Sequence, residues 1–423
     1  ILFTTTILDK PYAPGLSDTN QATISENNAG VLSTSTNIQQ IDLEVPEPEI
    51  TKGIVASDSA AAVYLPTQVG PVPFSSPGTA GARFTGEITS ANLAVNEIKS
   101  DIEGIDAHDI VTYAIVVENT GKGETFNTQI KDVLPNGMEV PVGGLNLNVS
   151  DGAGVARTYN NIGGGTGLLD QGIEITDPID DLTTATNGSN ILVITYDLQI
   201  AELVNIGKTI ENQAHIIKFA GRDGGVNYVS DPTVFQDIAE INTLEPSVTK
   251  VVSNTSLADT AGTAVVVGEE VEYTVTMNIP EGTFDEAQIR DTLDQCLAFT
   301  SLTSLTASPE ITSSEGSIAT ILSNANISNV GAGAINEGRK LNLDFGTLTN
   351  TADSNETLEN ITLVYKAVVL NGTTCNRATA LNNNATLLWG ENNGDDVIDP
   401  DELNVSAAAP NVVVNEPTIT LTK

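Results

Sequence analysis

The sequence predicts an all-β chain of tandem antiparallel β-sandwiches, and three observations carry this prediction. Apolar and polar residues alternate in short runs such as 109–117 and 270–277, which is the period of a half-buried strand. Clusters of Gly, Asn, Asp and Pro separate these runs, as they do in turn-rich β proteins. Whole phrases of sequence also recur at domain-sized spacing. We therefore expect very little helix.

Two recurring phrases define the repeat. The opening phrase pairs Glu-Pro with a short β-type run, and it occurs at Glu47–Lys52, Glu245–Lys250 and Glu416–Thr420. The closing phrase contains Asn followed two residues later by Ala, and it occurs at Thr19–Ile24, Glu211–Ile216 and Cys375–Ala380. Because opening and closing phrases alternate along the chain, each pair is expected to enclose one domain.

This alternation predicts the domain organisation. We expect the C-terminal part of a preceding repeat at 1–46, complete repeats at 47–244 and 245–415, and the first strand of a following repeat at 416–423. The Pro after each boundary Glu disfavours helix and stiffens the connection, which predicts domains joined end to end in an extended rod.

The first complete repeat carries an insertion at about 54–105. Its stretch Tyr64–Phe74 is apolar and rich in proline, so it is expected to be extended. Two interpretations remain open: the insertion contacts a partner or a neighbouring molecule, or it forms a loop that packs on its own domain.

Composition and charge limit the function. The 423 residues have a formal net charge of −38, which opposes binding to nucleic acid and to anionic membranes and attracts divalent cations. No run of 18 apolar residues occurs, so no membrane span is expected in this sequence. A chain of this kind is typical of an extracellular or cell-surface protein.

The recurring motifs resemble a bacterial and archaeal surface repeat. They are the strand Thr112–Val117, the turn Asp132–Gly137 and the closing Asn-x-Ala strand. Together they resemble the family called "domain of unknown function 11" and the related fimbrial domains that form isopeptide bonds. The second repeat departs from the motif at Asp294–Cys296, where the Pro-Asn-Gly of the turn is missing. The resemblance implies Ig-like sandwiches that serve as stalk or filament modules.

The first candidate chemistry is an autocatalytic bond between Lys and Asn inside each repeat. A lysine on the opening strand would attack an asparagine on the closing strand, and a protonated aspartic acid would polarise the amide. We expect the first and last strands of each sandwich to lie side by side and so to bring these residues together. The alternative is a solvated strand-end lysine and a turn-forming asparagine. The candidates are Lys52, Asn212 and Asp132 in one repeat, and Lys250, Asn376 and Asp291 in the next.

A second candidate is a calcium-binding loop at 391–402. Oxygen-donating residues are spaced there as in an EF-hand loop, with a main-chain carbonyl at the seventh position. The expected ligands are Glu391, Asn393, Asp395, Val397 (through its carbonyl), Asp399 and Glu402. Hard oxygen ligands favour calcium over zinc. The alternative is a solvated acidic hairpin tip.

The chain has two cysteines, Cys296 and Cys375. Both are expected to lie near the ends of core strands, so we predict that they form a disulfide. Two small buried thiols are the alternative.

The sequence therefore predicts a structural or adhesive module rather than an enzyme. Its expected partners are neighbouring repeats or subunits of the same protein, with a surface or cell ligand as a further partner. Two alternatives remain: a self-assembling extracellular filament or sheath subunit joined by donor-strand addition, and spacer domains of a larger secreted enzyme. Neither histidine nor the glycine-rich run 163–167 belongs to a recognisable catalytic or phosphate-binding motif.

Overall fold

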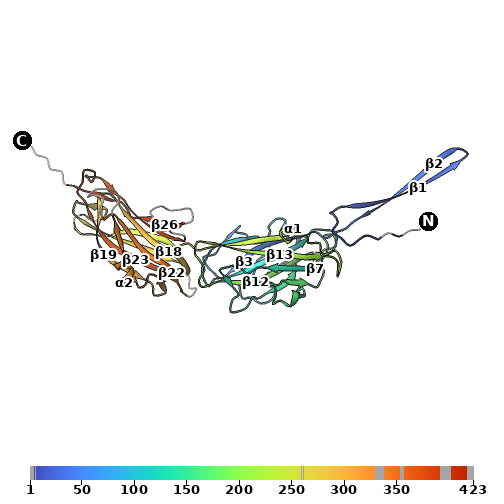
Figure 1. Ribbon diagram of the computed structural model, residues 1–423, viewed down its shortest axis with the longest axis horizontal. Helices are drawn as coiled ribbons and strands as arrows, with labels where there is room; N and C mark the ends of the chain where they lie inside the picture. Colours follow the sequence, from blue (N-terminus) through green and yellow to red (C-terminus); the bar gives the residue numbers. More distant parts are fainter. Residues whose placement is uncertain are drawn as a thin grey trace, which may run out of the picture. The chain divides into compact units, whose positions relative to one another are not determined.

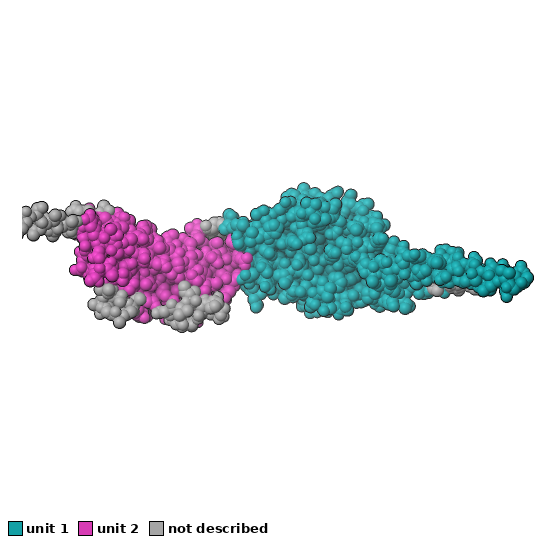
Figure 2. Space-filling view, turned by 90° about the horizontal axis from the view of Figure 1, so that it is seen from above, with its two compact units in different colours: residues 1–103, 110–199, 209–241 teal, residues 104–109, 200–208, 242–423 magenta. Residues whose placement is uncertain are grey.

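A computed structural model describes residues 4, 6–258, 260, 262–328, 338–352, 357–390 and 402–416. The chain is 52% strand and 4% helix, which confirms the predicted all-β fold class. It divides into two compact units, coloured separately in Figure 2: residues 1–103, 110–199 and 209–241, and residues 104–109, 200–208 and 242–423. Short helical segments interrupt the strands at α1 (Ser90–Leu93), η1 (Ile162–Gly164), η2 (Pro232–Val234) and α2 (Ile318–Ser323).

The first sandwich consists of two facing sheets (Figure 1). One sheet has the order β10 (Tyr159–Asn161), β11 (Ile173–Ile175), β7 (Phe126–Asp132), β13 (Thr209–Ala220), β14 (Gln236–Thr243), β5 (Asp101–Ile105) and β4 (Val63–Leu65). The other has the order β3 (Pro48–Ser57), β6 (Ile110–Asn119), β12 (Ile191–Ile200) and β8 (Met138–Glu139), and β9 (Asn148–Asp151) also pairs with β12.

The central strands β6 and β12 are buried on both faces. Their inward side chains fill the space between the sheets, whereas the outward ones, such as Val116 and Val193, belong to a second apolar cluster. That cluster is completed by the insertion, through residues such as Ile88 and Ile98. The insertion therefore packs on its own domain, as the second of the two sequence interpretations expects.

A buried ion pair holds the insertion to the sheet. Arg83, in the insertion, places Nη2 2.8 Å from Asp197 Oδ1 on β12, and both side chains are inaccessible to solvent. The same Nη2 donates to Thr112 Oγ1 at 2.8 Å. Because a buried charge is costly unless it is paired, these contacts fix the position of the insertion on the outer face.

The second sandwich again has two facing sheets. One has the order β15 (Ser247–Thr255), β17 (Glu270–Ile279), β23 (Glu359–Val369) and β19 (Leu297–Ala307). The other has the order β20 (Ile311–Ser313), β22 (Lys340–Asn350), β18 (Gly282–Leu293), β25 (Asn383–Gly390) and β26 (Glu402–Ala408), with β21 (Asn326–Ser328) also on β22. A small third sheet contains β16 (Ala264–Val265), β27 (Val412–Val414) and β24 (Ala380–Leu381).

Strands β17 and β23 of this sandwich alternate strictly between buried and more exposed side chains. They pair in antiparallel register, with Tyr273 opposite Tyr365. One face of their sheet therefore packs on the core and the other faces solvent, which is the arrangement that period-two patterning predicts.

The N-terminal segment forms a separate hairpin of β1 (Ser17–Asn28) and β2 (Val31–Asp42), drawn in blue in Figure 1. In the described part of the chain the two strands pair only with each other. Their side chains are almost all exposed. The hairpin carries one of the closing phrases, so this phrase is found on a strand here as it is in β13.

Candidate cross-link sites

Four strands bring a lysine, an acid, an amide and a phenol together inside the first sandwich. Lys52 comes from β3 and Tyr196 from β12, both in one sheet. Asp132 is the last residue of β7, and Asn212 lies near the start of β13, both in the facing sheet. All four are fully buried, so the site lies in the apolar interior between the sheets.

In this first site the aspartate connects the other groups. Lys52 Nζ lies 2.6 Å from Asp132 Oδ2. The Tyr196 hydroxyl donates to the same oxygen, and Asn212 Nδ2 donates to the Tyr196 hydroxyl at 3.1 Å. Asp132 Oδ1 and Asn212 Oδ1 are buried and have no hydrogen-bond partner. An unpaired buried acceptor is costly and rare in native proteins, so these two oxygens mark the site as a candidate for a functional role.

The second sandwich repeats the arrangement and closes it into a ring. Lys250 Nζ lies 2.6 Å from Asp291 Oδ2 and 2.5 Å from Asn383 Oδ1. Asn383 Nδ2 donates to the Tyr365 hydroxyl at 2.7 Å, and that hydroxyl donates to Asp291 Oδ2 at 2.8 Å. The amine therefore lies directly beside the carboxamide that it would attack.

Burial lowers the pKa of both lysines and so favours the neutral, nucleophilic amine. It lowers the pKa of Lys52 to about 8, although Asp132 acts in the opposite direction. It likewise lowers the pKa of Lys250 to about 8, against the effect of Asp291. Burial also raises the pKa of Asp291 above its usual range, and Lys250 only partly offsets this. In the second site both shifts act in the direction that amide exchange requires, toward a neutral amine and a protonated carboxyl.

The structure places Asn383, and not Asn376, beside Lys250. Asn376 is exposed, and its Nδ2 donates to the carbonyl of Thr373 at 2.7 Å. Asn383, which begins a second Asn-x-Ala phrase, occupies the position of Asn212. In the first sandwich Ala214 pairs with Asp132, and in the second Ala385 pairs with Asp291. Each asparagine lies two residues before its alanine, so the sheet register makes Asn212 and Asn383 equivalent.

The expectation that the first and last strands lie side by side was also wrong. β3 and β13 belong to different sheets, as do β15 and β25. The lysine reaches its partners across the interior because its side chain points inward from one sheet to the other. A covalent bond at either site would therefore join the two sheets of a sandwich.

Sequence reasoning missed Tyr196 and Tyr365. Tyr196 lies on β12, 16 residues before Asn212, and Tyr365 lies on β23, 18 residues before Asn383. Each is also stacked on the tyrosine of the adjacent strand, Tyr113 or Tyr273. This similar spacing in a chain with only eight tyrosines was the available signal.

The disulfide prediction is confirmed by the structure. Cys296 and Cys375 are bonded, with their Cα atoms 5.6 Å apart. Both residues are buried. The bond joins the turn after β18 to the segment before β24, within the same compact unit as the Lys250 site.

The predicted calcium loop lies almost entirely outside the described residues. Glu391, Asn393, Asp395, Val397 and Asp399 fall in the range 391–401, which connects β25 to β26. Glu402 is described; it is buried and begins β26. Over the residues that are described, no group of three or more His, Cys, Asp or Glu side chains is placed to hold a metal ion.

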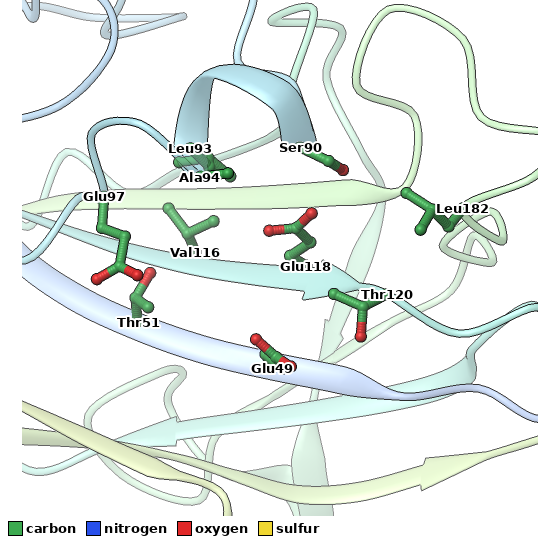
Figure 3. A pocket seen from close by; sticks show the side chains of 10 residues that line it. All are labelled: Glu49, Thr51, Ser90, Leu93, Ala94, Glu97, Val116, Glu118, Thr120 and Leu182. Carbon is green, nitrogen blue, oxygen red and sulfur yellow. The ribbon is translucent and has the colours of Figure 1, made fainter. Parts of the chain in front are cut away.

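A pocket of about 510 Å³ lies on the other face of the β3–β6 sheet, next to α1 (Figure 3). Three carboxylates line it, and two of them, Glu49 and Glu118, are opposite each other on adjacent strands. None of the ten lining residues is Lys, His or Cys. The pocket therefore has none of the buried lysines that define the interior sites.

Comparisons with known proteins give the following results. No protein-family model and no curated protein sequence matches the chain. Among solved structures, the C-terminal domain of the Streptococcus pyogenes antigen I/II-family protein AspA is 15% identical over 74% of this chain and 96% of its own, with a TM-score of 0.29. The full-length major pilin SpaD from Corynebacterium diphtheriae is 14% identical over 85% of this chain and 66% of its own, with a TM-score of 0.28. Similarity of this degree does not assign the chain to a family.

Helices in the described residues are short, and none has the length and apolar character needed to cross a membrane.

Proposed function

We propose that this chain is a structural, tension-bearing module of a microbial cell surface, in which each sandwich is locked by an intramolecular isopeptide bond. The bonds would join Lys52 to Asn212 and Lys250 to Asn383. The observation that carries the proposal is the duplicated interior site, in which Lys, Asp, Tyr and Asn are linked by hydrogen bonds in both sandwiches. The repeat keeps this costly buried arrangement in both copies, which supports a shared chemistry.

The reaction would exchange one amide for another. The neutral lysine amine attacks the asparagine carboxamide carbon, and ammonia leaves. The buried aspartic acid contacts the lysine amine and the tyrosine hydroxyl, so it is placed to accept the proton that the amine loses. Because the lysine and the asparagine come from facing sheets, the product would bridge the interior of the sandwich. It would also close a long loop in the unfolded chain, which stabilises the folded state by ~5 kcal/mol if it acts as a disulfide of that loop length does.

The disulfide and the charge support an extracellular location. Structural disulfides persist in oxidising compartments, and the Cys296–Cys375 bond is of this type because both residues are buried. A net charge of −38 keeps such a chain soluble and away from nucleic acid. The partners would be neighbouring repeats or subunits of the same protein.

Intact-mass spectrometry tests the proposed bonds. The full chain is expected to weigh less than its disulfide-bonded sequence by the mass of two ammonia molecules. Tandem mass spectrometry of a protease digest should then yield one branched peptide for each lysine–asparagine pair. A mass that matches the unmodified sequence would contradict the proposal. Lys52→Ala and Lys250→Ala are the matched variants, and each should restore one ammonia.

A second candidate, a self-assembling filament subunit, is favoured by the β1–β2 hairpin. A two-stranded hairpin with exposed faces is only marginally stable in water, and it presents unpaired strand edges. A second copy of the chain would pair with such an edge by strand addition. Negative-stain microscopy of the purified chain separates the two: strand exchange gives fibres of increasing length, and a non-exchanging module gives discrete particles.

A further inference from the structure

The two buried tyrosines that bridge acid and amide occupy equivalent places in the two sites. Tyr196 and Tyr365 each accept a hydrogen bond from the carboxamide nitrogen and donate one to the carboxyl oxygen. That nitrogen is the atom that must leave as ammonia. The contacts that connect Asn383 Nδ2 to the acid therefore pass through a phenol.

We propose that Tyr196 and Tyr365 are catalytic residues that relay the proton of the aspartic acid to the departing amide nitrogen. The inference rests on the cross-linking proposed above. The tyrosine hydroxyl takes part in the reaction directly, since it contacts Nδ2, the atom that leaves as ammonia.

The proton transfers balance around the ring. As Lys250 Nζ bonds to the carboxamide carbon of Asn383, the C=O π electrons move to Oδ1 and Nδ2 becomes an amine with a free lone pair. Tyr365 gives its proton to Nδ2 and takes one from Asp291. Asp291 in turn accepts the proton that Lys250 Nζ loses, across a contact of 2.6 Å. The C–Nδ2 bond then breaks, its electron pair leaves with ammonia, and the oxygen electrons restore the carbonyl. Asp291 and Tyr365 are both protonated at the end of the reaction, as they were at the start.

The hydrogen-bond direction fits this sequence. In the unreacted amide the Nδ2 lone pair is delocalised, so the nitrogen can only donate, and it donates to the phenol at 2.7 Å in the second site. Once the carbon is tetrahedral the same nitrogen accepts, and the hydroxyl needs only to rotate. The phenol does not have to ionise stably, which agrees with burial raising the pKa of Tyr365 well above its usual value.

The test is Tyr365→Phe in the full chain. Intact mass and digest mass spectrometry are followed from purification through prolonged incubation. The variant should retain one ammonia at purification and lose it at least ~100-fold more slowly than the wild type, because general acid–base groups contribute factors of this size. The unaltered Lys52–Asn212 site in the same molecules is the internal control for folding and should already be cross-linked.

Tyr273→Phe is the matched comparison. Its hydroxyl also contacts Asn383 but is not the one that bonds to Asp291. This variant should slow the reaction far less than Tyr365→Phe does. Equal slowing by both, or a Tyr365→Phe variant that reacts as fast as wild type, would overturn the relay while leaving the cross-link intact. Absence of ammonia loss from the wild type would instead overturn the cross-link and the relay with it.

Discussion

Lys250 and Asn383, which are 133 residues apart in the chain, meet inside the second sandwich with Nζ 2.5 Å from Oδ1. They come from strands β15 and β25, which lie in facing sheets. The contact is fully buried and includes an acid that binds the same amine. Burying a lysine is energetically costly, and its position beside a carboxamide is what the proposed cross-link requires.

The choice between Asn383 and Asn376 is directly testable. Asn383→Ala should restore one ammonia to the mass of the chain, because it removes the carboxamide that faces Lys250. Asn376→Ala should leave the mass loss unchanged, since that side chain is exposed and donates to the Thr373 carbonyl rather than facing Lys250. Intact-mass spectrometry of the two variants measures both results. The reverse pattern would refute the register-based assignment.

The lowered pKa of Lys250 predicts how stability depends on pH when the bond is absent. In Asn383→Ala the folded state releases the lysine proton near pH 8, whereas the unfolded state holds it until near 10.5. Between these values the unfolded state binds the extra proton, so the free energy of unfolding should rise with pH. The slope is at most roughly 1.4 kcal/mol per pH unit. Denaturant unfolding between pH 7 and 10 measures it.

The control for this effect is the double variant Lys250→Met with Asn383→Ala. It lacks the titrating amine, so the rise attributable to this site should disappear. If both proteins show the same slope above pH 8, Lys250 is not the group responsible.

The Arg83–Asp197 ion pair is expected to anchor the insertion. Arg83→Met leaves Asp197 buried without its guanidinium partner, which should cost about 3–5 kcal/mol of stability. Lys99→Met is the matched change, because the Lys99–Glu97 pair is mostly exposed and should contribute only about 0–1 kcal/mol. Chemical denaturation compares the two. A loss from Arg83→Met no larger than that from Lys99→Met would show that the apolar cluster alone fixes the insertion.

We also propose that the segment 391–402 binds calcium. Calcium that binds only the folded chain should stabilise it by ~2.7 kcal/mol at a concentration 100-fold above the dissociation constant. Thermal unfolding with calcium and with a chelator measures this shift. Asp395→Asn together with Glu402→Gln should abolish it, while magnesium should replace calcium poorly because it demands a tighter geometry. Identical unfolding in calcium and in chelator would exclude the site.

The strand pattern was predictable because period-two alternation is local. β17 and β23 show it cleanly, since only one face of their sheet is buried. β6 departs from it because the insertion covers its outer face, and this could not be derived from the strand alone. The assignment of strands to sheets was likewise not derivable. We expected β3 and β13 to be adjacent in one sheet, but they lie in facing sheets, because the connections between strands set the topology.

At the sites, sequence repetition identified the lysines and acids because their phrases align without ambiguity. The asparagine of the second repeat was missed because the Asn-x-Ala phrase occurs twice, at Asn376 and Asn383, and only register with β18 distinguishes them. Tyr365 was missed because its role depends on a hydrogen bond between strands of facing sheets. Such relationships have no counterpart in local spacing.

The position of the asparagine on β13 leaves β14 outside the loop that a Lys52–Asn212 bond would close. The next closed loop would begin at Lys250, so residues 213–249 form a stretch that neither bond protects. Under load this stretch would unfold and lengthen by on the order of 100 Å, because tension would pass directly from Lys52 to Asn212 and from Lys250 to Asn383 through the two bonds. It would therefore be the extensible part of the chain between two closed loops that cannot extend.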